Sequence, residues 1–169
     1  TMHKHYQLHV HHIYPYLHYS TVHSAKLKPI QAVLEMAERK FHQVFHTRWL
    51  SFEGAVNAII ASLDPLFTVL RDDSDSDPTA KGILTFVTTF QFLASTYLLA
   101  DILSVLANLS RRFQRALVDF TTVSEGLSLT ISALESFKMT PGPKLQEFLK
   151  QIPSNESATN SFIYLGHEI

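Results

Sequence analysis

The fold is decided by the stretch Thr79–Gln114, which reads TAKGILTFVTTFQFLASTYLLADILSVLANLSRRFQ. Drawn as a helix, its polar residues form two groups about a third of a turn apart. One group is Thr85, Thr88, Thr89 and Thr96, and the other is Asp101, Ser104 and Asn108. A straight helix with one polar side does not shift that side so abruptly. We therefore predict a kink or break near Tyr97–Ala100, or else a helix that neighbours cover on several sides.

The same stretch is long and apolar enough to raise the question of a membrane span. Ile83–Leu109 is interrupted by polar residues along its length, so it lacks the run of about 18 uninterrupted apolar residues typical of a spanning helix. An aspartate at mid-depth, Asp101, would also be costly in a bilayer. We interpret the stretch as a buried core helix and predict no membrane contact.

Helical patterns flank this centre on both sides. Before it, apolar residues recur every three or four positions, with Ser51 as the expected N-cap and a kink expected at Asp64-Pro65. After it, a second such set follows Asp119. Met139–Pro143 is a strong breaker, and a short helix is expected beyond it. The three apolar sets are Phe52, Val56, Ile59, Ile60, Leu63, Phe67 and Leu70; Phe120, Val123, Leu127, Ile131 and Leu134; and Leu145, Phe148, Leu149 and Ile152.

The two ends of the chain differ from this pattern. Residues 1–19 are rich in His and Tyr and read as an arm or frayed helix, and Ser20 or Thr21 is expected to cap the next helix. Residues 20–152 form the helical domain, and residues 153–169 are a linker and the start of a following segment. We predict an all-α fold, an irregular bundle of five or six helices with a possible short C-terminal strand.

The composition of the chain limits the classes of function that it can have. The chain has 169 residues, a net charge of −1, 17% charged residues and no cysteine. The charge argues against nucleic-acid binding driven by bulk charge, so any DNA contact has to be local. The missing cysteines exclude disulfides, zinc fingers and thiol chemistry within this chain.

The acidic run Asp72–Asp77 resembles the opening of a calcium loop but fails as one. Asp73, Asp75 and Asp77 match the first three ligands, yet Pro78 stands where the loop needs Gly and Leu84 where it needs Glu. We interpret the run as a solvated linker in which Asp77 caps the next helix and Pro78 takes its first position.

The histidines fall into two groups with helical spacing. His5, His9 and His12 would share a helical face, as would His42 and His46, but a closed zinc site needs four ligands in an ordered frame. We therefore predict adventitious rather than physiological metal affinity. No nucleophile elbow and no phosphate-binding glycine loop occurs. The sequence predicts no enzyme activity in isolation, no cofactor and no small-molecule substrate.

The stretch Thr47-Arg48-Trp49-Leu50-Ser51 contains the only tryptophan. In one interpretation Trp49 anchors a helix start in the core and Arg48 is a solvated flank. In the other, the pair faces nucleic acid: an indole stacked on an unpaired base contributes about 1–3 kcal/mol, and Arg can hold the neighbouring phosphate.

Several segments resemble the hAT superfamily of DNA transposases and the zinc-finger proteins derived from them. They are Ser24–Leu27, Thr47–Ser51, Gly82–Leu84 through Phe90–Asp101, Val118–Phe120 and Gly166–Ile169. The likeness runs from about residue 12 to the end. The later segments follow in the family's order and spacing, which strengthens the likeness of the RWLS element, Arg48–Ser51. The His-rich arm before it does not follow the family pattern.

The resemblance implies a position inside a larger protein. In such transposases a long all-α insertion splits an RNase H-like core, and the RW element lies in the insertion. The catalytic acidic residues, a Cys-x-x-His element, the zinc finger and the dimerisation segment lie outside it and have no counterpart here. This chain thus looks like the insertion domain with its flanks removed.

Only Arg48 and Trp49 carry over as site residues, because in active relatives the tryptophan packs near the flipped base at the cleavage site. The resemblance implies a nuclear protein with possible DNA contact, and possible protein partners or dimerisation through the missing regions. We predict a non-catalytic helical domain that contributes to DNA or protein binding. The alternative is a stand-alone helical protein-interaction module with no nucleic-acid role. For Trp49 we expect a helix-start anchor first and a DNA contact second.

Overall fold

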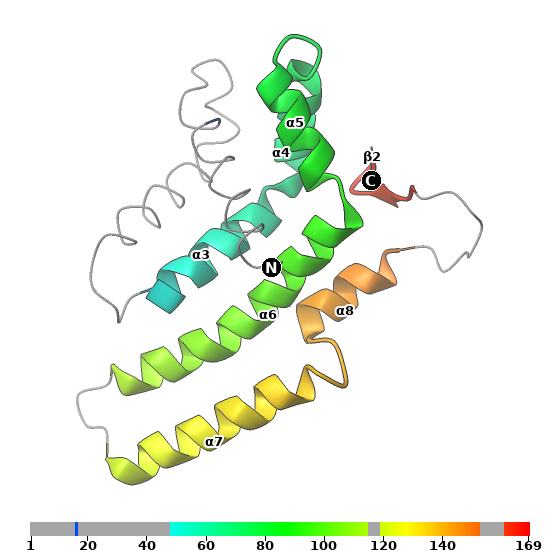
Figure 1. Ribbon diagram of the computed structural model, residues 1–169. Coiled ribbons are helices and arrows are strands. Elements are labelled where there is room, and N and C mark those ends of the chain that lie inside the picture. The colour runs from blue at the N-terminus through cyan, green and yellow to red at the C-terminus, as the bar shows by residue number, and fades with distance from the viewer. Residues whose placement is uncertain (1–15, 17–47, 115–118, 153–160) are drawn as a thin grey trace.

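The computed structural model describes residues 16, 48–114, 119–152 and 161–169. Within these ranges the chain forms six helices and one two-stranded hairpin (Figure 1), so the prediction of an all-α bundle with a short C-terminal strand is confirmed. The arm 1–19 apart from Tyr16, the helix predicted from Ser20 or Thr21, and the linker residues 153–160 lie outside the described residues.

Helices α3 (Arg48–Ala61) and α4 (Leu63–Asp73) meet at Ser62 with a bend of 66°. The bend predicted at Asp64-Pro65 is therefore present, but it is a break between two helices at Ser62 and not a kink within one helix. Pro65 is the third residue of α4, where its missing N–H removes no intrahelical hydrogen bond. Ser51 is not the N-cap either, since α3 already begins at Arg48.

Helices α5 (Pro78–Val87) and α6 (Phe90–Phe113) divide the long apolar stretch. The break lies at Thr88-Thr89, so the break predicted near Tyr97–Ala100 is wrong. The side chain of Thr89 accepts a hydrogen bond from the Phe92 N–H at 3.2 Å, which caps α6. The predicted start of α5 is confirmed: Asp77 Oδ1 accepts from the Thr79 N–H at 2.7 Å, and Pro78 takes the first position.

Helix α6 is the centre of the molecule. It continues without a break for 24 residues, with α3, α7 (Phe120–Ser136) and α8 (Pro143–Lys150) packed against it (Figure 1). This arrangement confirms the second interpretation of its polar pattern, a helix covered on several sides. Helices α4 and α5 pack on each other beyond the end of α6.

The C-terminal strand is a hairpin. Strands β1 (Ile163–Tyr164) and β2 (His167–Glu168) pair antiparallel, with Tyr164 opposite His167. The turn residues Leu165 and Gly166 have φ values of 52° and 80°. Left-handed turns of two residues match the twist of a hairpin, but only glycine adopts them without strain.

The core joins α3, α4, α5, α6, α8 and the hairpin. Its largest fully buried side chains are Phe67, Phe92, Phe148, Ile59, Leu63, Leu66, Leu70 and Leu93. Each side chain of this size stabilises the fold by about 1.5–3 kcal/mol through burial. Between α3 and α6, the buried residues Val56, Ala100 and Leu103 form a second cluster.

One described helix, α6, is long and apolar enough by length and composition to cross a membrane. Helices α3 and α4 reach that measure only if the bent pair is counted as one span. The buried core helix of a protein can meet the same criterion of length and composition. Three helices of the bundle, α3, α7 and α8, pack on α6.

Candidate functional site

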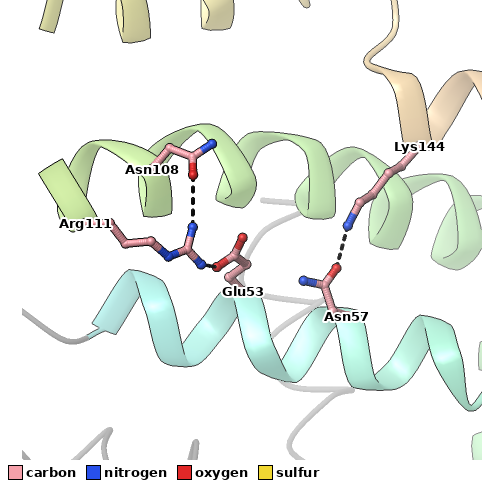
Figure 2. A network of polar contacts seen from close by, with 5 residues as sticks. All are labelled: Glu53, Asn57, Asn108, Arg111 and Lys144. Carbon is pink, nitrogen blue, oxygen red and sulfur yellow. Dashed lines mark hydrogen bonds and ion pairs between the residues drawn. The ribbon is translucent and has the colours of Figure 1, made fainter. Parts of the chain in front are cut away.

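Arg48 and Trp49, the predicted DNA-contacting pair, are the first two residues of α3. Their backbone is helical, and their side chains lie outside the described part of the chain. The side of α3 that faces α6 is described from Phe52 onward, and it holds the polar contacts shown in Figure 2.

Two polar bridges connect α3 to its neighbours (Figure 2). Near the start of α3, Glu53 forms an ion pair with Arg111 of α6, which also donates to Asn108 Oδ1 at 3.0 Å. One helical turn further on, Asn57 Oδ1 accepts from Lys144 Nζ of α8 at 2.6 Å. The two bridges connect α3 to α6 and to α8 along the same side of α3.

Asp101 is the buried carboxylate at the middle of α6. Its Oδ1 accepts from the backbone N–H of Lys144 at 3.1 Å, and its Oδ2 accepts from the backbone N–H of Leu145 at 3.0 Å. The helix N-cap residue Gly142 has no side chain to supply these bonds. Asp101 therefore caps α8 from another helix, and its negative charge is favourable at the positive end of the α8 dipole.

This geometry describes a structural junction. Lys144 takes part in it twice, through its backbone N–H to Asp101 and through its ammonium group to Asn57. In the described ranges, the two carboxylates of these contacts, Glu53 and Asp101, each have protein partners.

An aromatic cluster holds the hairpin against the helices. Phe148 of α8 stacks on Tyr97 at a centroid distance of 4.9 Å and meets Tyr164 edge to face at 5.2 Å. The hydroxyls of Tyr97 and Tyr164 share a hydrogen bond of 2.5 Å. Burial first, and then this hydrogen bond, raises the pKa of Tyr97 above its usual range. Burial likewise raises the pKa of Tyr164.

The hairpin also contacts α4. His167 Nε2 lies 3.0 Å from Asp64 Oδ1, and the His167 ring packs edge to face on Phe67. Arg71 donates from Nη2 to the Glu168 carbonyl at 3.1 Å. These contacts fix the last residues of the chain on the helical body.

The candidate metal residues are not brought together where the structure describes them. The acidic run ends α4 and caps α5, as expected of a linker, and the Tyr16 hydroxyl donates to Asp73. Within the described ranges no three His, Asp or Glu side chains lie where they could hold a metal ion. The candidates His5, His9, His12, His42 and His46 lie outside those ranges.

The surface of α7 was not anticipated from the sequence. Its apolar spacing predicts a helix face that packs into the core, but Phe120, Leu127 and Ile131 are 86%, 41% and 55% exposed. The position of α7 that is buried on α6 is Gly126, where an added Cβ would lie 3.4 Å from Leu109. The apolar face is therefore turned partly to solvent. Large, regularly spaced apolar side chains of this kind are typical of binding surfaces.

Comparison with protein-family models, curated proteins and solved structures gives no match. The likeness to hAT transposases therefore stays a prediction from the segments quoted above.

Proposed function

We propose that the chain is a non-catalytic helical domain of a hAT transposase-derived nuclear protein and that it binds a protein partner. The observation that carries the proposal is the exposed apolar face of α7, where Leu127 and Ile131 stand in solvent one helical turn apart. Covering such side chains releases free energy of about 25 cal/mol for each Å² of apolar surface. Nothing in the described bundle covers them.

The interior polar contacts support a scaffold role. Asp101, Lys144 and Glu53 are engaged with protein groups that join helices. Such contacts make the bundle rigid, and a rigid helix face loses little entropy when a partner binds. These contacts join α3, α6 and α8, and α7 packs on this body through α6.

DNA contact through Arg48 and Trp49 is the second candidate function. The resemblance of Thr47–Ser51 to the transposase element favours it, as does the position of both residues in the first turn of α3. Phosphate groups are stabilised near helix N-termini, and an indole can stack on an unpaired base. Helix α7 is a poor surface for DNA, because its charged residues are acidic and would repel the phosphate backbone.

The test of protein binding is proximity labelling in cells with the chain fused to a biotin ligase. The chain should label nuclear proteins, and Ile131→Ser should lose a subset of them. The matched variant is Leu129→Ser, which removes an equally exposed leucine from the opposite side of α7. Purified members of the lost subset should bind the unaltered chain in calorimetry. Identical labelled sets for both variants would contradict the proposal.

The test of DNA binding is fluorescence anisotropy with single-stranded and hairpin oligonucleotides. A DNA contact predicts binding that weakens with salt and falls in Trp49→Ala while circular dichroism is unchanged. If Trp49→Ala unfolds the chain, Arg48→Gln provides the second measurement. Binding that neither variant changes would remove the pair from any DNA site.

A further inference from the structure

The loop that joins α7 to α8 (Figure 1) contains a dipeptide that occurs once in the chain. Of the seven prolines, Pro141 is the only one that follows a serine or threonine, and that residue is Thr140. Proline-directed protein kinases phosphorylate a serine or threonine in this position, because their pocket leaves the next backbone N–H without an acceptor and proline has no N–H. The sequence therefore offers this class of kinase a single acceptor residue.

Thr140 and Pro141 are both exposed, and they lie outside the helices, between the end of α7 and the start of α8. In the described part of the chain, the Thr140 hydroxyl has no hydrogen-bond partner. By contrast, the hydroxyl of Thr130 donates to the Gly126 carbonyl within α7 at 2.8 Å. Oγ1 of Thr140 is therefore accessible to an enzyme and free to react.

The backbone around Thr140 can take the extended form in which a kinase groove holds its substrate. Thr140 itself is favoured in extended conformations because it precedes a proline, and Gly142 already has extended values, φ −66° and ψ 168°. Before Thr140 the chain forms a terminal turn, in which the N–H groups of Lys138 and Met139 donate to carbonyls at the end of α7 at 3.0 and 3.1 Å. Because Met139 is 88% exposed, opening this turn removes little buried surface and costs little free energy.

The amides in the first turn of α8 are already engaged. The N–H groups of Lys144 and Leu145 donate to the carboxylate of Asp101 at 3.1 and 3.0 Å, and that of Gln146 donates to the Gly142 carbonyl at 2.8 Å. The first residue of α8 is a proline, which has no N–H. A phosphate in this loop would therefore meet the positive end of a helix that the carboxylate of Asp101 already occupies.

The charged side chains near the loop have both signs. Lys138 is exposed two residues before Thr140, and Glu135 lies in the last turn of α7. Lys144 lies in the first turn of α8, where its ammonium group donates to Asn57 Oδ1 at 2.6 Å (Figure 2). The two lysines reduce the repulsion that a phosphate of charge about −1.5 to −2 would meet from the neighbouring carboxylates.

We propose that Thr140 is phosphorylated by a proline-directed protein kinase and that the phosphate weakens the Asp101 cap of α8. Oγ1 of Thr140 attacks the γ-phosphorus of ATP, and the new O–P bond forms while the bond to the oxygen between the β- and γ-phosphates breaks. ADP leaves, and the hydroxyl proton passes to a carboxylate of the kinase. The phosphate then lies two residues from Gly142, which packs on Asp101, so the two anions repel each other at the start of α8. The site shares no residue with the exposed apolar face of α7 or with the pair Arg48 and Trp49.

The purified full chain is incubated with ATP and, in separate reactions, with a cyclin-dependent and a mitogen-activated protein kinase. With at least one of them, mass spectrometry should find a phosphate on Thr140, and Thr140→Ala should abolish it. Pro141→Ala should lower the initial rate at least about tenfold, because it introduces the N–H that the kinase pocket leaves unpaired. The matched control, checked like the other variants for folding by circular dichroism, is Thr79→Ala, an exposed threonine before alanine that should leave the rate unchanged. No phosphate on Thr140 with either kinase, or an undiminished rate in Pro141→Ala, would overturn the site.

Hydrogen exchange of the phosphorylated chain tests the effect on the cap. The amides of Lys144 and Leu145 should exchange at least about threefold faster than in the unmodified chain. The Phe92 amide, which Thr89 caps at the start of α6, should be unchanged. Unchanged exchange of the two α8 amides, or an equal increase at Phe92, would overturn the effect of the phosphate on α8.

Discussion

The carboxylate of Asp101 lies in the space that a side chain on Gly142 would need. A Cβ added at Gly142 would stand 2.4 Å from Asp101 Oδ2 and 2.7 Å from Asp101 Cβ. Glycine at this position therefore permits the close approach through which Asp101 reaches the first amides of α8.

Gly142→Ala is expected to destabilise the fold by about 1–3 kcal/mol, because the added methyl group must displace either Asp101 or the start of α8. Thermal unfolding measures this as a fall of roughly 2–4 °C for each kcal/mol. The control is Gly82→Ala in α5, where nothing lies within 4 Å of the added Cβ. That variant should gain about 0.4–1 kcal/mol, and an equal loss in both would contradict the close approach.

Asp101→Ala removes the acceptor of two part-buried backbone N–H groups. We expect a loss of about 1–3 kcal/mol in denaturant unfolding, since part-buried donors left without an acceptor carry a desolvation cost. Hydrogen exchange should locate the effect at the amides of Lys144 and Leu145. Gln91→Ala, at an exposed position of the same helix, should change stability by no more than about 0.5 kcal/mol. Undiminished protection of the two amides in Asp101→Ala would refute the cap.

The Tyr97–Tyr164 pair predicts loss of stability at high pH. Burial and hydrogen bonding raise the pKa of Tyr97 in the folded chain, whereas a tyrosine of the unfolded chain titrates near pH 10, an approximate reference value. Above that pH the unfolded chain binds fewer protons, so stability falls as pH rises, by at most about 1.4 kcal/mol per pH unit. Urea unfolding between about pH 8 and 11.5 measures the slope. Tyr97→Phe should flatten it, and an unchanged slope would exclude Tyr97 as its source.

Leu165→Asn should stabilise the hairpin. Leu165 has a φ of 52°, which asparagine adopts more readily than leucine, and Asn-Gly is a preferred two-residue hairpin turn. We expect a gain of about 0.5–1 kcal/mol, visible as increased exchange protection of the Phe162 and Ile169 amides. Ile163→Asn, at a strand position with ordinary φ, should instead lower protection. A loss in Leu165→Asn would mean that the leucine side chain contributes more than the turn strain costs.

Local patterns predicted the helices, and in part their limits. The start of α5 at Asp77-Pro78 and the short α8 after the Met139–Pro143 breaker follow from residues adjacent in sequence. The break at Thr88-Thr89 was missed because apolar residues continue on both sides, and a threonine can lie inside a helix or cap one. Its capping bond to Phe92 distinguishes the two only once the backbone is known.

The contacts between elements were less predictable. An aspartate inside an apolar helix has to be paired when it is buried, so a partner for Asp101 is implied by the sequence. That the partner is the start of α8, 43 residues away at Lys144, is not. The regular spacing of Leu127 and Ile131 likewise predicts a helix face. Whether that face is covered depends on neighbours that no local pattern contains.

The cap on α8 has a consequence for the order in which the chain folds. With eight residues, α8 is shorter than the roughly 12–15 residues that an isolated helix needs. Its first amides find their acceptor on α6, so α8 forms only after α6 is in place. Phe148 then enters the core, and Tyr97, Tyr164 and the hairpin assemble around it. We therefore expect α8 and the hairpin to form after α6.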